Sequence, residues 1–154
     1  MKKSAAKKST PGDRRYPARP IVGIGIVIWR GDKVLLVKRG KPPRQGEWGL
    51  PGGVQNVGET IMAAAVREAR EETGLDITPL GIITALDGIS KDKNGKVEFH
   101  YTIIDIAAES REGEAEAGDD VSDVRWATVD EVDTLCAWPE VLRVVRLSLV
   151  QKVL

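Results

Sequence analysis

Three glutamates lie close together near the middle of the chain, in a segment rich in alanine, glutamate and arginine that predicts a helix. Glu71 and Glu72 follow Glu68 by three and four positions, a spacing that places side chains on one face of an α-helix. Carboxylates that share a face repel one another, at a cost of about 0.2–0.5 kcal/mol per pair. A divalent cation turns that repulsion into a ligand set, and Mg²⁺ prefers carboxylate and water oxygens. Taken alone, such a run of charges is more often a solvated face whose side chains exchange ion pairs, so the helical spacing makes a magnesium site a candidate and does not decide for it.

The residues around these glutamates can support such a site. Arg67 lies one helical turn before Glu71, where its guanidinium can hold a carboxylate by a charge-assisted hydrogen bond. Upstream, Pro51 is followed by Gly52 and Gly53. Glycine lets a backbone carbonyl approach a metal, because no side chain stands in the way. Together these residues indicate metal-dependent chemistry.

The stretch from residue 46 to residue 75 resembles the signature of the Nudix hydrolases. That signature is a glycine, five residues, a glutamate, seven residues, and then R-E-apolar-x-E-E-x-G-apolar. Every specified place is filled, by Gly53, Glu59, Arg67, Glu68, Ala69, Glu71, Glu72, Gly74 and Leu75. From average residue frequencies, a chance match somewhere in the chain is on the order of 10⁻⁷. The one mild departure is Ala69, which is smaller than the Leu, Ile or Val that is commoner there.

The resemblance implies a hydrolase that cleaves a nucleoside diphosphate linked to another group, with Mg²⁺ as its cofactor and Mn²⁺ as a substitute. It implies that carboxylates of this motif, the Nudix box, and one carbonyl hold the metal, namely Glu68, Glu71, Glu72 and Gly52. Arg67 would orient a glutamate during catalysis. Gly53, Glu59 and Gly74 would have structural roles.

The general base has two candidate sources, because Nudix enzymes take it either from the box or from an acidic loop before a late strand. In the box, the favoured base is Glu71 or Glu68. In the loop at residues 114–120, the first candidate is Asp120, followed by Asp119 and Glu116. A solvated acidic loop without a catalytic role is an equally simple interpretation of this second group.

Candidate substrate contacts surround a long loop after the second predicted strand: Arg39, Lys41, Arg44 and Trp48. The three cations can hold phosphates by charge-assisted hydrogen bonds, although each taken alone is more simply a surface cation. Trp48 can stack on a base or anchor the loop, and anchoring is favoured. The motifs that distinguish several Nudix subgroups are absent. Overall similarity favours ADP-ribose or a related nucleotide sugar, cleaved with release of a nucleoside monophosphate.

Two other functions stay open. One is a nucleoside triphosphate pyrophosphatase that cleanses the nucleotide pool. The other is a non-catalytic module that senses nucleotides, but such modules usually lose a box carboxylate, and all are intact here.

The elements that position these residues follow from hydrophobic periodicity and turn signals. Strands are predicted at 21–29, 33–39, 77–87, 97–107 and 122–128, with a loop at 40–58 and a hairpin turn at 92–95. A helix is predicted from Glu59 or Thr60 to Thr73, closed by Gly74. A helical turn at 129–134 and a helix at 139–150 follow, the latter with an apolar side of Val141, Leu142, Val145, Leu147 and Val150. This order predicts an α/β domain, and the resemblance implies an α/β/α sandwich with a mixed sheet between helices.

Composition sets the remaining expectations. The chain has 154 residues, 42% hydrophobic and 30% charged, which is typical of one soluble domain. No run of 18 apolar residues is present, so we expect no membrane span. A single cysteine, Cys136, excludes an internal disulfide framework and favours the cytoplasm.

The charges divide the chain into two parts. Residues 1–19 carry seven basic side chains and one acidic one, a net charge of +6, and the remainder carries −6. We therefore expect a flexible basic tail at 1–19, with at most weak contacts to nucleic acid, and a Nudix domain at 20–154. The expected partner is a small nucleotide. A homodimer through the apolar first strand and the last helix is also plausible from the sequence.

Overall fold

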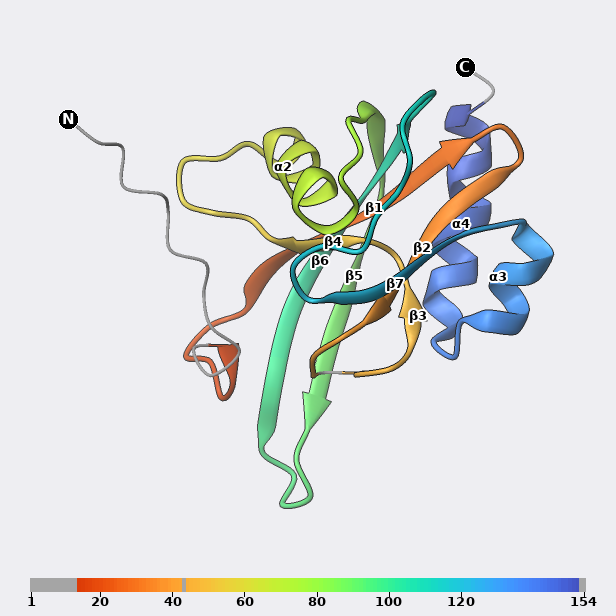
Figure 1. Ribbon diagram of the computed structural model, residues 1–154. Helices are drawn as coiled ribbons and strands as arrows, with labels where there is room; N and C mark the ends of the chain where they lie inside the picture. Colours follow the sequence, from red (N-terminus) through yellow and green to blue (C-terminus); the bar gives the residue numbers. More distant parts are fainter. Residues whose placement is uncertain (1–13, 43, 153–154) are drawn as a thin grey trace.

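The computed structural model describes residues 14–42 and 44–152, and most of the basic tail predicted at 1–19 lies outside this part of the chain. The elements follow in the order β1 (Ile21–Arg30), β2 (Lys33–Arg39), β3 (Trp48–Gly49), β4 (Gly52–Val54), α2 (Ile61–Thr73), β5 (Thr78–Lys91), β6 (Val97–Glu109), β7 (Val121–Ala127), α3 (Val129–Leu135) and α4 (Pro139–Lys152). They form a mixed sheet with α2 on one face and α3 and α4 on the other (Figure 1). The predicted α/β/α sandwich is confirmed.

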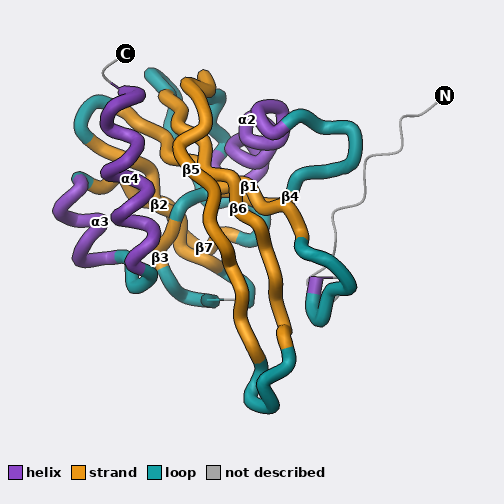
Figure 2. Tube along the Cα trace, turned by 180° about the vertical axis from the view of Figure 1, so that it is seen from behind, coloured by secondary structure: helices purple, strands orange, loops and turns teal. Residues whose placement is uncertain are grey.

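The sheet forks around β1. Its main strand order is β3-β2-β1-β6-β5, in which β1 runs parallel to β6 and the other neighbours are antiparallel. β1 meets β2 only through Trp29 and Arg30, whereas its residues 23–25 pair with β4, and β7 pairs with the far side of β2. The long β5–β6 hairpin extends beyond the body of the protein (Figure 2).

Alternation along β1 divides the core in two, because successive side chains of a strand point to opposite faces. Ile24, Ile26 and Ile28 join the apolar cluster beneath α2. Val27 and Trp29 join the cluster beneath α3 and α4. Trp29 also donates from Nε1 to Ser148 Oγ at 2.9 Å, which ties α4 to the sheet. Each face of β1 therefore anchors a different helical layer.

Both ends of α2 are fixed by local capping. Thr60 Oγ1 accepts a hydrogen bond from the Ala63 N–H at 3.0 Å, so this side chain satisfies a free donor of the first turn. At the other end Gly74 adopts a left-handed conformation with φ of 73° and donates to the Arg70 carbonyl at 3.0 Å. The predicted start and end of this helix are confirmed.

Three details differ from the sequence-based expectation. The stretch at 40–58 is not only loop, because β3 and β4 form within it and pair with β2 and β1. The strand predicted at 77–87 continues to Lys91 at the hairpin turn, and the strand predicted at 97–107 continues at its other end to Glu109. On α4, Leu147 and Val150 are 43% and 71% exposed, and the core side is formed by Val141, Val144, Val145 and Ser148.

Two further observations bear on assembly and membranes. β1 lies inside the sheet with neighbours on both sides, so this strand offers no free edge for pairing with a second copy. Among the described residues, no helix has the length and apolar character that crossing a membrane would require.

Candidate active site

Arg67 of α2, whose side chain is 23% exposed, binds four different groups. Its Nε and Nη2 donate to the two carboxylate oxygens of Glu59 at 2.5 and 2.9 Å. Its Nη1 donates to Glu68 at 2.7 Å and to Glu71 at 3.1 Å. Its Nη2 also donates to the carbonyl oxygen of Val54 at 2.9 Å. One guanidinium therefore holds three carboxylates and the end of β4 together.

The charges of this network stabilise each other. The hydrogen bond from Arg67 is the main cause that lowers the pKa of Glu59, and the Asn56 N–H adds to it with a bond of 2.9 Å. The same bond is the main cause that raises the pKa of Arg67 above its usual value. Glu59 thereby connects the start of α2 to the loop before it.

The backbone of β4 lies directly against two box glutamates. Gly52 donates its N–H to Glu72 Oε1 at 2.8 Å. A Cβ atom at Gly53 would collide with the carboxylate of Glu68, so only glycine lets the backbone come this close. Glu68 is 4% exposed. The side chain of Glu71 is 31% exposed. These contacts place Glu68 and Glu72 beside the Gly52–Gly53 backbone, and Arg67 links Glu71 to Glu68.

The oxygen donors needed for a hard divalent cation are gathered here, but they have other partners. Glu68 and Glu71 accept from Arg67, and Glu72 accepts from Gly52. Within residues 14–42 and 44–152, no three acidic, histidine or cysteine side chains form a group that could hold a metal ion as they stand. A cation at this position would compete with Arg67 for the carboxylates.

The acidic loop at residues 114–120, which contains the alternative candidates for the general base, is attached to the end of α2. Gly118 donates to the Glu72 carbonyl at 2.9 Å, and Glu116 donates to the Thr73 carbonyl at the same distance. A Cβ atom at Gly118 would collide with the Glu71 carbonyl, so glycine permits this close contact too. Asp119 and Asp120 therefore follow a loop segment in contact with the box helix.

Lys41 and Asp120, which were singled out for different roles, pair with each other. Lys41 Nζ lies 2.8 Å from Asp120 Oδ1, and Gly40 donates its N–H to the Asp120 carbonyl at 2.7 Å. Both side chains remain about half exposed. The sequence did not predict this link between the end of β2 and the acidic loop.

The other candidate substrate contacts divide between two places. Arg39 ends β2, where its backbone bonds to Glu47 and Gly46 close the loop after it. Arg44 lies over the ring of Trp138, 4.7 Å from the ring centre, near the start of α4. Trp48 packs against the apolar cluster on the same side of the sheet. Arg44 and Trp48 are thus grouped on the α4 side.

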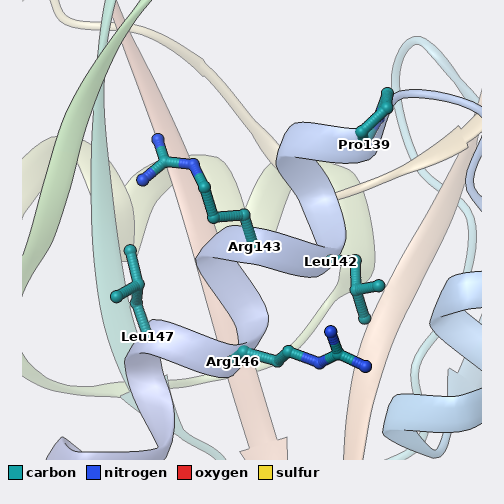
Figure 3. A pocket seen from close by; sticks show the side chains of 5 residues that line it. All are labelled: Pro139, Leu142, Arg143, Arg146 and Leu147. Carbon is teal, nitrogen blue, oxygen red and sulfur yellow. The ribbon is translucent and has the colours of Figure 1, made fainter.

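Two surface hollows are found in the described part of the chain, one on α2 and one on α4. One lies on α2 and is lined by Arg67, Arg70 and Glu71 together with Met62, Ala63, Val66 and Pro79, so it adjoins the Arg67 network. The other lies on α4 and is lined by Pro139, Leu142, Arg143, Arg146 and Leu147 (Figure 3). The α4 hollow is lined by arginines and apolar residues and has no carboxylate. Of these two hollows in the described part of the chain, it is the α2 hollow that borders groups suited to a cation.

The NUDIX domain family matches residues 19–147 of this chain. The chain belongs to the Nudix hydrolase family. An ADP-ribose pyrophosphatase of Methanocaldococcus jannaschii is 32% identical over 86% of this chain and 76% of its own length. A putative 8-oxo-dGTP diphosphatase of Mycobacterium tuberculosis is 44% identical over 40% of this chain and 44% of its own length. The NUDIX domain of Shewanella oneidensis NrtR, solved with ADP ribose, has a TM-score of 0.69 at 22% identity, covering 87% of this chain and 89% of that one.

Membership makes the chain a Nudix hydrolase, an enzyme of a family that generally uses divalent metal ions and acts on small nucleotides. The Nudix box is the segment from Gly53 to Leu75 that carries the Arg67 network. Two contacts of Arg67 were not predicted from the sequence, namely those with Glu59 and with the Val54 carbonyl. The sequence signal for these contacts was weak, because Val54 reaches Arg67 only through β4, a strand of three residues.

Proposed function

We propose that this Nudix hydrolase is a magnesium-dependent pyrophosphohydrolase that cleaves the diphosphate of ADP-ribose or a related nucleotide sugar and releases a nucleoside monophosphate. The observation that carries the proposal is the gathering of three box carboxylates: Arg67 binds Glu68 and Glu71, and the Gly52–Gly53 backbone contacts Glu68 and Glu72. The name of the M. jannaschii relative and the ligand of the S. oneidensis domain support the choice of ADP-ribose.

Glu68, Glu71, Glu72 and the Gly52 carbonyl would hold the magnesium ion. All four are hard oxygen donors of the kind that Mg²⁺, or Mn²⁺ in its place, prefers. When bound, the cation neutralises the diphosphate and lowers the pKa of a water molecule. Arg67 fixes the carboxylates before the metal arrives, and Glu59 fixes Arg67. Gly53 keeps the backbone of β4 against Glu68, and Gly74 ends the helix that carries all three glutamates.

Glu71 is the better placed of the two box candidates for general base. Its side chain is 31% exposed, whereas that of Glu68 is 5% exposed and held beneath the Gly53 backbone. A base must reach the water that it deprotonates, which favours the more exposed group. Asp120 is the second candidate, and its ion pair with Lys41 must open before it can act.

The substrate would lie across the two groups of contacts described above. Arg39 and Lys41, at the end of β2 beside the acidic loop, are assigned to the phosphates. Arg44, which lies over the ring of Trp138, and Trp48, which packs on the same side of the sheet, are assigned to the sugar.

The decisive test is turnover of a nucleotide panel with Mg²⁺ by the wild type and by Glu72→Gln. The panel contains ADP-ribose, nucleotide sugars, NADH, diadenosine polyphosphates, and ordinary and oxidised nucleoside triphosphates, with products resolved by chromatography. We expect ADP-ribose to give AMP, and the variant to be slower by about 10³-fold, because one electrostatic stabiliser of the transition state is lost. Glu112→Gln, an exposed change of the same chemistry, is the matched control.

Other outcomes separate the alternatives. Preferred hydrolysis of an oxidised nucleoside triphosphate would make this a nucleotide-pool enzyme, a function that the M. tuberculosis relative favours by its name. Binding of a nucleotide without hydrolysis of any panel member would make it a sensing module. A cytoplasmic location and a homodimer stay predictions of the sequence.

A further inference from the structure

Asp105 is a buried acid that the proposed chemistry does not use. It lies in the interior strand β6, its residue is 3% exposed, and among the described residues its Oδ2 has no hydrogen-bond partner. A buried polar group without a partner costs about 1–3 kcal/mol, so such atoms are rare and require an explanation. For the ionised form of Asp105 the missing partner is a hydrogen-bond donor, because a carboxylate only accepts.

The strand beside Asp105 is shaped to receive its carboxylate. Gly25 of β1 is directly opposite Asp105 in the parallel register, and a Cβ atom at Gly25 would collide with Oδ1. The acid therefore extends over bare backbone rather than over another side chain. On the same strand β6, Tyr101 and Ile103 point to the same face and are only half-buried.

On the α4 side of the sheet, a strip without side chains leads from Asp105 to Gly52, the residue whose N–H binds Glu72 of the α2 side. Gly25 pairs with Asp105 on one side and with Gly52 on the other, so these three residues are consecutive across β6, β1 and β4. Directly paired residues point to the same face of a sheet. Two strand spacings, about 10 Å, separate Asp105 from Gly52, whose carbonyl is a proposed metal ligand. This span is comparable with the length of a nucleoside.

The charged groups that face Asp105 come from the first turns of α4. Arg143 and Glu140 influence it electrostatically, but Arg143 donates twice to Glu140 Oε2, at 2.7 and 2.9 Å. Figure 3 shows Arg143 on α4. The pKa of Asp105 is raised to about 7, mainly by burial. Arg143 opposes this rise, and Glu140 contributes to it. At pH 8 the ionised, accepting form predominates.

We propose that Asp105 recognises the base of the substrate by accepting a hydrogen bond from an exocyclic amino group, as on adenine. The inference rests on the proposed function, since the glycine strip would carry the nucleoside while the box holds the diphosphate. A base with an oxo group in that place would set two acceptors against each other. Asp105 is therefore a specificity-determining residue that favours an amino-bearing purine.

The test compares ADP-ribose with its hypoxanthine analogue, which carries an oxo group in place of the amino group and a proton on the adjacent ring nitrogen. Binding is measured by calorimetry at pH 8 in the presence of a chelator, and turnover is measured separately with Mg²⁺. We expect the wild type to bind ADP-ribose at least about tenfold more tightly. In Asp105→Asn, whose amide both donates and accepts, the ratio should fall to near one. Asp87→Asn, the same change at an exposed site on β5, should keep the wild-type ratio.

Each result decides a different question. Equal binding of the two ligands by the wild type, no binding of either, or an unchanged ratio in a folded Asp105→Asn protein overturns the inference. Hydrolysis of ADP-ribose without discrimination keeps the proposed function and removes this role of Asp105. Discrimination between the two ligands without hydrolysis of ADP-ribose keeps this role of Asp105 and removes the proposed function. Thermal unfolding of each variant establishes that it is folded.

Discussion

The two faces of the sheet treat buried acid in opposite ways. Glu68, on the α2 side, and Asp105, on the α4 side, are 4% and 3% exposed, so their burial is nearly equal. Glu68 accepts a short hydrogen bond from Arg67, whereas Asp105 has an oxygen without a partner in the described chain. The comparison teaches that a neighbouring cation, rather than depth of burial, decides how a buried carboxylate is stabilised.

Removing Arg67 should have the largest effect on folding, because the carboxylates of the α2 side would then lack a hydrogen-bonded cation, as Asp105 does among the described residues of the α4 side. In Arg67→Gln, three carboxylates lose their common counter-charge. Breaking a largely buried ion pair by removing one partner costs about 3 kcal/mol. We expect a loss of that size in the free energy of unfolding, measured by urea denaturation at pH 7.

The control for this change lies one turn away on the same helix. Arg70 pairs with Asp76, and the two side chains are 63% and 80% exposed. Exposed pairs contribute up to about 1 kcal/mol and often nothing measurable. Arg70→Gln should therefore leave stability almost unchanged. Similar losses of unfolding free energy in the two variants would show that the Arg67 network stabilises the fold no more than an exposed ion pair does.

Much of the α2 side could be predicted from the sequence, because its signals are local. The cap at Thr60, the end at Gly74 and the shared face of the glutamates all follow from spacing within one helix. Arg67 was expected to hold one carboxylate, but it also binds Glu59 and the Val54 carbonyl. Those contacts depend on β4, a three-residue strand without a hydrophobic pattern of its own.

The α4 side was far less predictable, because its contacts join distant segments. Asp105 sits in an apolar run, which marks it as unusual, but only the parallel register of β1 and β6 places it over Gly25. Why Leu147 and Val150 are exposed likewise depends on how α4 lies on the sheet.

A change at Asp105 should have an intermediate effect on stability that depends on pH. The folded-state pKa is raised to about 7, mainly by burial, while an unfolded aspartate has a pKa of about 3.9. The folded protein therefore holds this proton more tightly, and wild-type stability should fall as pH rises from about 4 to 7. Asp105→Asn removes that penalty, so we expect it to gain about 2 kcal/mol at pH 8 and little at pH 4. Thermal unfolding at both pH values measures the difference. A gain of equal size at both would mean that Asp105 does not titrate in this range.

The smallest effect on folding is expected at the edge of the molecule, where Lys41 and Asp120 pair while about half exposed. Lys41→Gln and Asp120→Asn should each change the free energy of unfolding by less than about 1 kcal/mol, because water already screens the pair. Their kinetics are more informative. If Glu71 is the base, both variants should lower kcat by less than tenfold, whereas loss of a general base costs about 10²–10⁴-fold. A large fall in kcat for Asp120→Asn alone, with Lys41→Gln and Asp119→Asn close to the wild type, would move the base from the box helix to the loop. The Arg67 network would then hold the metal without supplying the base.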